Sequence, residues 1–185
     1  MKTKLAKILG IGATLALLAS LLITAIPAAA ISQPTVSLDD YVISHTTKYT
    51  TIFSITKDLD AGDLIVIEFP SGTDLTNVTD DGLDVDVQVA ATSGIGSPDY
   101  AATNAASTKS PDTTKGPTLK VEAPIFTGMG AMVAVYVSNV KNPDAAGDYS
   151  LKVSIVDGIL GTTQEAVVTS TTYKIEIPTI QKAHE

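Results

Sequence analysis

The stretch from Leu83 to Val89 reads Leu-Asp-Val-Asp-Val-Gln-Val, and it decides the fold class. Apolar and polar side chains alternate at every position along it. Successive side chains of a β-strand point to opposite faces of the sheet, so this period of two predicts a strand with one buried face and one solvated face. We expect the inward face to carry the side chains of Leu83, Val85, Val87 and Val89.

Seven further runs rich in Val, Ile, Thr and Tyr carry the same signature, with Gly, Pro and Asp turn residues between them. Residues 31–185 show no convincing helical period. Eight short strands predict an all-β fold, a two-sheet antiparallel β-sandwich of the immunoglobulin-like type. The seven runs are Thr35 to Ile43, Thr47 to Thr56, Asp63 to Phe69, Thr118 to Ala123, Ala131 to Val140, Tyr149 to Val156 and Glu165 to Ile177.

Three local patterns refine this prediction. In the second run the side chains of Tyr49, Thr51, Phe53 and Ile55 share one face. The third run is almost continuously apolar, so we expect it deep in a sheet, and Pro70 ends it because proline has no N–H for the ladder. Two similar connections place glycine where a tight turn needs positive φ, at residues 60–63 and 145–148.

Residues 90–117 lose this periodicity and are filled with Ala, Ser, Thr, Gly, Pro and Asp. The composition predicts a long flexible loop. Residues 31–185, with this loop included, have the length of one ordinary domain, large enough to enclose a hydrophobic core. We therefore expect a single β-sandwich domain interrupted by this loop.

The first thirty residues have the pattern of an export signal. Three lysines precede an apolar run from Ile8 to Ile26, and Pro27 precedes the small-residue triplet Ala28-Ala29-Ala30. This pattern predicts a signal peptide, residues 1–30, that is cleaved after Ala30. An uncleaved membrane anchor is the alternative, because the apolar run is long enough to cross a bilayer, but that interpretation leaves the triplet unexplained.

The charge balance limits the partners of the chain. Removing the three lysines of the signal changes the net charge from −8 to −11, with nine lysines and no arginine left against 20 acidic residues. Such a surface repels phosphate backbones and anionic lipid, so we expect no nucleic-acid partner and no membrane contact after cleavage. The chain has no cysteine, so its stability must come from packing.

The residues that carry acid–base or nucleophilic chemistry are sparse. The two histidines are His45, in a predicted turn, and His184, next to the end of the sequence. No serine lies in a nucleophile-elbow frame, and without tryptophan the chain lacks the large aromatic residue that often lines sugar-cleaving sites. We do not expect an enzyme and assign no catalytic residue.

One segment is rich in carboxylates. Residues 80–86 place four of them within seven positions, with Asp74 and Asn77 just upstream. Calcium takes six to eight oxygen ligands, so this segment is a candidate calcium site, although it misses the register of the EF-hand loop. The alternative is an acidic turn followed by a solvated strand face. The candidate ligands are Asp80, Asp81, Asp84 and Asp86, and we expect no other cofactor.

The triplet Asn77-Val78-Thr79 matches the acceptor sequence for N-linked glycosylation. Such triplets also arise by chance. Asn77 is a candidate glycosylation site in a host that modifies secreted proteins.

Three segments together resemble a known family. They are Leu59 to Pro70, then Val140-Lys141-Asn142-Pro143 leading into Ala146 to Val153, and finally Ser170 to Ile175. In this order they resemble the Ig-like β-sandwich modules of prokaryotic S-layer-associated and adhesin-like surface proteins. The resemblance covers most of residues 35–177. It implies a scaffolding or adhesive role and supplies no catalytic residues.

Three functions remain open at this point. The first is a structural or adhesive module at the cell surface, with other surface or envelope proteins as partners. The second is a self-associating filament subunit, in which the strand after Ile31 completes the sheet of a neighbouring copy. We favour pairing of that strand within its own domain. The third is a carbohydrate-binding module that stacks exposed tyrosines on sugar rings, the candidates being Tyr41, Tyr49, Tyr100, Tyr136, Tyr149 and Tyr173.

Overall fold

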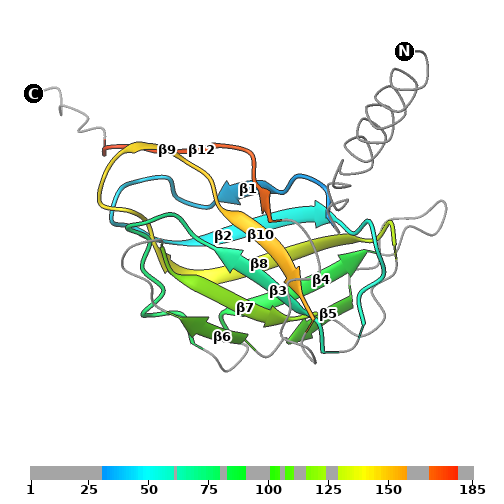
Figure 1. Cartoon of the computed structure of the whole chain (residues 1–185). Coiled ribbons are helices and arrows are strands. Elements are labelled where there is room, and N and C mark those ends of the chain that lie inside the picture. The colour runs from blue at the N-terminus through cyan, green and yellow to red at the C-terminus, as the bar shows by residue number, and fades with distance from the viewer. Residues whose placement is uncertain are drawn as a thin grey trace, which may run out of the picture.

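Two five-stranded antiparallel sheets lie against each other in the computed structural model (Figure 1). The structure describes residues 31–60, 62–79, 83–90, 101–104, 107–110, 116–123, 129–157 and 167–178. None of these residues is helical, and the predicted all-β two-sheet sandwich is confirmed. Within the same residues, no helix is long and apolar enough to span a bilayer.

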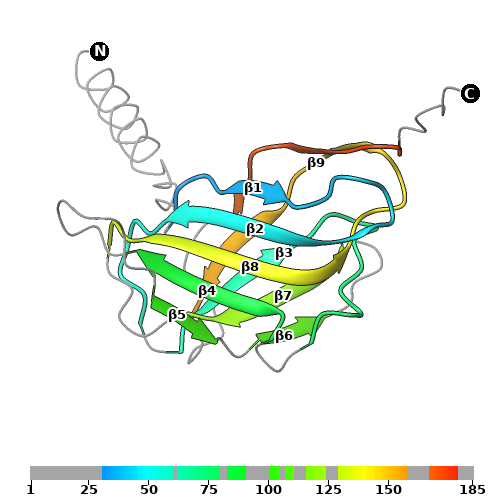
Figure 2. The same cartoon turned by 180° about the vertical axis from the view of Figure 1, so that it is seen from behind.

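The first sheet has the strand order β1-β2-β8-β4-β5, and the second has the order β11-β10-β3-β7-β6. A two-stranded sheet of β9 and β12 lies near β1, at one edge of the sandwich (Figures 1 and 2). The strands are β1 (Thr35–Leu38), β2 (Thr46–Ser54), β3 (Leu64–Glu68), β4 (Val85–Ala90), β5 (Ala101–Asn104), β6 (Ser107–Ser110), β7 (Thr118–Glu122), β8 (Met132–Lys141), β9 (Gly147–Tyr149), β10 (Lys152–Val156), β11 (Val168–Thr169) and β12 (Tyr173–Ile175).

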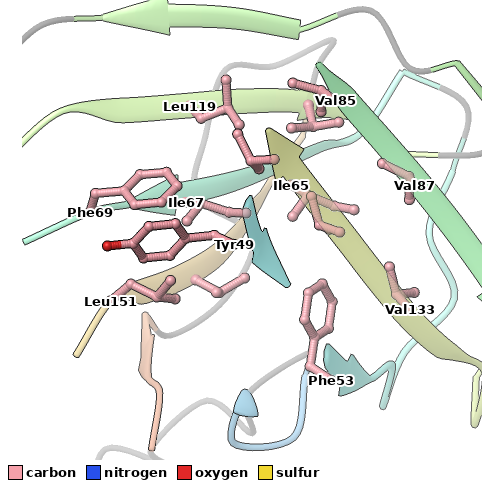
Figure 3. Packing of buried hydrophobic residues seen from close by; sticks show 14 of the residues in the cluster. Tyr49, Phe53, Ile65, Ile67, Phe69, Val85, Val87, Leu119, Val133 and Leu151 are labelled. Carbon is pink, nitrogen blue, oxygen red and sulfur yellow. The ribbon is translucent and has the colours of Figure 1, made fainter. Parts of the chain in front are cut away.

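The core lies between the two large sheets. Strand β2 turns Tyr49, Thr51 and Phe53 inward, followed by Ile55, and all four side chains are buried as predicted. Strand β3 occupies the middle of the second sheet between β10 and β7, which confirms the position expected for the third run. Figure 3 shows side chains of both sheets meeting in this space, with Phe53 and Val133 from the first sheet and Ile65 and Leu119 from the second.

The register of β4 confirms most of the expected inward face. Val85 and Val87 are fully buried, and Val89 is partly buried against the core. The prediction is wrong for Leu83, whose residue surface is 82% exposed. The strand begins only at Val85, and residues 83 and 84 form a bend, where the alternation of a pleated strand no longer fixes the direction of a side chain.

Several predicted boundaries need correction. Residues 90–117, expected to be one long loop, contain β5 and β6, which pair with β4 and β7 at the ends of the two sheets. Two of the predicted runs each contain parts of two strands, because the chain changes its strand-pairing partner within them. The runs are Tyr149 to Val156, where the change falls at Leu151, and Glu165 to Ile177, where it falls at Ser170. There the N–H of Ser170 donates to the carbonyl of Leu151, and the N–H of Leu151 donates to the Ser170 hydroxyl. The described residues thus form twelve strands instead of eight.

The two glycine turns behave differently. Gly62 has a φ of 92°, in the region that favours glycine, and it directly precedes the approach to β3. Gly147 does not have a positive φ and lies in β9. The short sequence similarity of the two connections therefore does not produce the same turn.

Prediction for β4. The change Val85→Asp places a carboxylate among apolar side chains and should cost several kcal/mol, comparable to the roughly 5–15 kcal/mol that hold a domain folded. The neighbouring change Asp86→Ala is the matched control and should alter the free energy of unfolding little, because one Asp86 carboxylate oxygen is buried without a hydrogen-bond partner. Urea denaturation of both variants checks this. A larger loss for Asp86→Ala would show that the register is wrong.

Candidate functional site

The loop between β1 and β2, residues 39–45, holds a connected group of polar side chains. The Asp40 carboxylate accepts a hydrogen bond from the Val42 N–H at 2.9 Å and lies 2.8 Å from Nδ1 of His45. The Asp40 N–H donates to the Thr47 hydroxyl at 2.8 Å. The contact with His45, and then the Val42 N–H, lower the pKa of Asp40 because both stabilise the charged carboxylate.

The side-chain amide of Asn142 holds this loop by hydrogen bonds. Its side-chain N–H groups donate to the carbonyls of Asp40, at 3.0 Å, and Val42, at 2.8 Å. Its Oδ1 accepts the hydroxyl of Tyr49 at 2.8 Å, and its main-chain N–H donates to the carbonyl of His45. Asn142 is fully buried, and these bonds satisfy the side-chain amide that burial removes from water.

Tyr49 belongs to a cluster of four aromatic rings. Its ring lies edge-on to Phe69, with centroids 5.5 Å apart, and to Tyr173, with centroids 5.8 Å apart. Tyr149 lies 6.4 Å from Tyr173. Burial raises the pKa of Tyr49 and of Tyr173, so both phenols stay protonated at physiological pH. Figure 3 shows Tyr49 between Phe69 and Leu151.

The neighbouring serine does not complete a catalytic triad with the histidine. Ser44 has a φ of 58°, and its hydroxyl donates to Asp144 at 2.7 Å, while Nδ1 of His45 contacts Asp40. The hydrogen bond from Ser44, with the nearby charge of Lys141, lowers the pKa of Asp144. The two acidic residues therefore bind separate partners, and this pattern fastens the loop to the segment after β8.

A β-bulge lies beside this loop. Where Lys48 faces β8, the partner strand provides two residues, Ser138 and Asn139, because the register shifts there. Asn139 has a φ of 59°, a conformation that asparagine tolerates better than most residues. A shallow, open pocket of about 320 Å³ borders the bulge, and it is lined by Asp39, Asp40, Thr46, Thr47, Lys48, Ser138 and Asn139.

The structure describes two of the four predicted calcium ligands, since Asp80 and Asp81 lie outside the described residues. The Asp84 carboxylate accepts the N–H and the hydroxyl of Thr79 on one oxygen, both at 2.8 Å, and the Asn139 amide on the other at 2.7 Å. Asp86 lies in β4 and accepts the Gln88 amide. The described part of the chain holds no group of three or more potential metal-binding side chains, so the calcium site stays a prediction that depends on residues 80 and 81.

The other sequence candidates have varied surroundings. Asn77 is exposed in a turn before the buried Val78, and its glycosylation stays a prediction. Among the tyrosines considered for sugar stacking, Tyr49 and Tyr173 belong to the core. Lys48 places its ammonium group 5.6 Å from the ring centre of Tyr136. His184 and Tyr100 lie outside the described residues.

Sequence reasoning missed the role of Asn142. It lies in the segment Val140-Lys141-Asn142-Pro143, which carries the family resemblance, but nothing local marks the asparagine as buried. Its partners belong to residues 40, 42 and 49, about a hundred positions away. The available signal in the sequence was that Asn142 is a polar residue just before Pro143, at the end of a strand.

No family model matches the chain, and no curated protein matches it. Among solved structures, the chain is similar to the bacterial hydrophobin BslA, with 12% identity, a TM-score of 0.42, and coverage of 82% of this chain and 100% of that one. AvmM, which catalyses macrocyclization in alchivemycin A biosynthesis, shows 7% identity, a TM-score of 0.43, and coverage of 85% and 94%. A collagen-binding domain of a Staphylococcus aureus adhesin shows 14% identity, a TM-score of 0.36, and coverage of 80% and 95%. No function transfers to this chain at such low similarity.

Prediction for the buried amide. The change Asn142→Ala leaves two loop carbonyls and the Tyr49 hydroxyl without their partner, at about 1–3 kcal/mol for each buried group that stays unpaired. We expect a total loss of roughly 3–5 kcal/mol of unfolding free energy. The exposed Asn77→Ala is the control and should be close to neutral. Equal denaturation midpoints for the two variants would contradict the anchoring role of Asn142.

Prediction for calcium. If the acidic segment at residues 80–86 binds calcium, a chelator should lower the melting temperature, and millimolar calcium should restore it, since a ligand of the folded state raises stability. Magnesium at equal concentration controls for ionic strength. A melting temperature that neither treatment changes would assign these carboxylates to a solvated acidic turn.

Proposed function

We propose that this chain is a non-catalytic β-sandwich protein that acts outside the cell, as a secreted or cell-surface structural or adhesive module. The observation that carries the proposal is the burial of Ile31. Ile31 is only 3% exposed, forms a β-bridge with Ile55, and is the first residue after the expected cleavage site. The first residue of the expected mature chain thus takes part in the core, which suits a domain that folds after export.

Composition and packing support the same proposal. A domain without cysteine must be stabilised by its core, and here the inner faces of two five-stranded sheets provide it. The net charge of −11 expected after cleavage favours a soluble exterior and disfavours nucleic acid or anionic lipid as partner. Other surface or envelope proteins are the partners that fit these properties.

The outer face of the first sheet is the surface that we propose for such a partner. Cross-strand pairing brings Ile52 of β2 beside Ala134 of β8, and Tyr136 and Met132 lie on the same face of β8. Ile52 and Tyr136 are partly exposed, and Met132 is 40% exposed. Tyrosine and methionine are enriched in protein interfaces, and a mixed face of this kind suits an adhesive contact.

Prediction for export. Expressed with its full sequence in a bacterial host, the protein should be found outside the cytoplasm with Ile31 as its first residue, as measured by fractionation and N-terminal sequencing. Exported protein that begins at Met1 or Lys2 would contradict the cleavage.

Binding to envelope material gives a second measurement on the same protein. The mature chain should cosediment with isolated envelopes of its native host, and Ile52→Asp should weaken this binding. Val66→Asp is the matched control, because Val66 is also a partly exposed residue, on the outer face of the second sheet. Equal loss in both variants would exclude the first sheet as the binding face.

A further inference from the structure

The N-terminal segment lies along the edge of the first sheet and contacts it through one strand. Strand β1 pairs with β2 of the same chain, with Thr35 opposite Ile52 and Leu38 opposite Tyr49. Ahead of β1, the N–H of Ser32 donates to the carbonyl of Ser54, and the N–H of Ser54 donates to the Ser32 hydroxyl, both at 2.8 Å. Ile31, Pro34 and Leu38 are buried, so the segment fills a groove of the sandwich with apolar side chains.

The outer edge of this segment is closed by other parts of the chain. The N–H of Thr171 donates to the carbonyl of Pro34 at 2.8 Å, and the N–H of Leu38 donates to the Tyr41 hydroxyl at 3.1 Å. The N–H of Glu176 donates to the carbonyl of Tyr41 at 2.7 Å, and its carbonyl accepts the N–H of Ile43. Figure 2 shows the C-terminal segment running along the same edge of the sandwich as β1. Both ends of the described chain therefore form one seam, with residues 171–176 as its outer part.

The connection behind β1 is long enough to act as a hinge. Residues 39–45 separate β1 from β2, and seven residues span at most about 25 Å when extended. An extended connection would carry β1 away from its own β2. The groove left on β2 would then expose main-chain groups and apolar pockets, which together form a pairing template.

We infer that this groove is an interaction surface for the N-terminal segment of a second copy of the chain, and that residues 171–176 form the latch that retains the segment in its own domain. The occupant is residues 31–38, because the structure shows how that sequence fits the groove. The hydrogen bonds and pockets of residues 31–38 serve either arrangement. Exchange therefore costs the bonds that hold the loop at residues 39–45, and it is governed by protein concentration, by that loop and by the latch.

This inference goes beyond the proposed function and does not depend on it. Exchange between copies would occur in any compartment, and a protein that does not exchange would still suit a surface role.

Two copies with one cysteine each provide the test. Ser37 and Thr50 lie opposite each other on β1 and β2, and both point to the outer face of the sheet. Because the chain has no cysteine, a disulfide between Ser37→Cys in one copy and Thr50→Cys in a second, isotope-labelled copy reports β1 of one copy reaching β2 of the other, above the background from chance collisions of surface thiols. The matched control is Val66→Cys mixed with Ser154→Cys, an opposing outward pair in the middle of the second sheet.

The expected result is a disulfide-linked heterodimer that is severalfold more abundant for the first pair than for the control pair and increases with concentration. Glu176→Pro, which removes the N–H that binds Tyr41, should raise its rate of formation roughly two- to tenfold, the effect of losing about one hydrogen bond. Thr171→Pro tests the latch a second time, and circular dichroism confirms that each variant is folded.

Two outcomes would overturn the inference. Heterodimer no more abundant than in the control pair, with and without the latch substitutions, would show that the segment stays in its own domain. An excess of heterodimer that folded latch variants leave unchanged would remove residues 171–176 from the mechanism.

Discussion

The hydrogen bond between the Tyr49 hydroxyl and the Asn142 side chain joins more parts of this protein than any other single contact described above. Through Tyr49 it reaches β2 and, by ring contacts, Phe69 after β3 and Tyr173 of β12. Through Asn142 it holds the loop between β1 and β2. The two sheets, the loop after β1 and β12 thus meet at one buried polar pair, in a core that is otherwise mostly apolar.

Most of the fold could be predicted from the sequence, because the strands at the centres of the sheets must bury one face. The alternation along β2 fixed which side chains enter the core, and the apolar run of β3 indicated its central position. The prediction failed where this constraint ends. Leu83 continues the alternation of apolar and polar residues, but it lies before the first residue of its strand. Strands β5 and β6 are edge strands of Ala, Ser, Thr, Asn and Lys that need main-chain hydrogen bonds to only one neighbouring strand.

The polar sites were harder to predict, because a polar side chain is positioned by partners that are distant in sequence. The acidic segment indicated carboxylates close together, yet Asp84 accepts its hydrogen bonds from Thr79 and from Asn139 on another strand. Asn142 carries no periodic signal, and its burial depends on carbonyl groups of a loop about a hundred residues earlier. Local sequence patterns indicate which face of a strand is buried. They do not indicate which groups form the hydrogen bonds of a buried amide.

The bulge in β8 limits which deletions in the gene the fold can tolerate. Before the bulge, odd-numbered residues such as Val135 and Val137 face the core, and after it the even-numbered Val140 and Asn142 do. One extra residue therefore reverses the parity of the strand and brings Asn142 to Tyr49. Losing a single codon between positions 137 and 140 would turn Val140 and Asn142 toward solvent, although the bulge itself lies at the surface. The length of this short segment is consequently under stronger constraint than the identity of its exposed side chains.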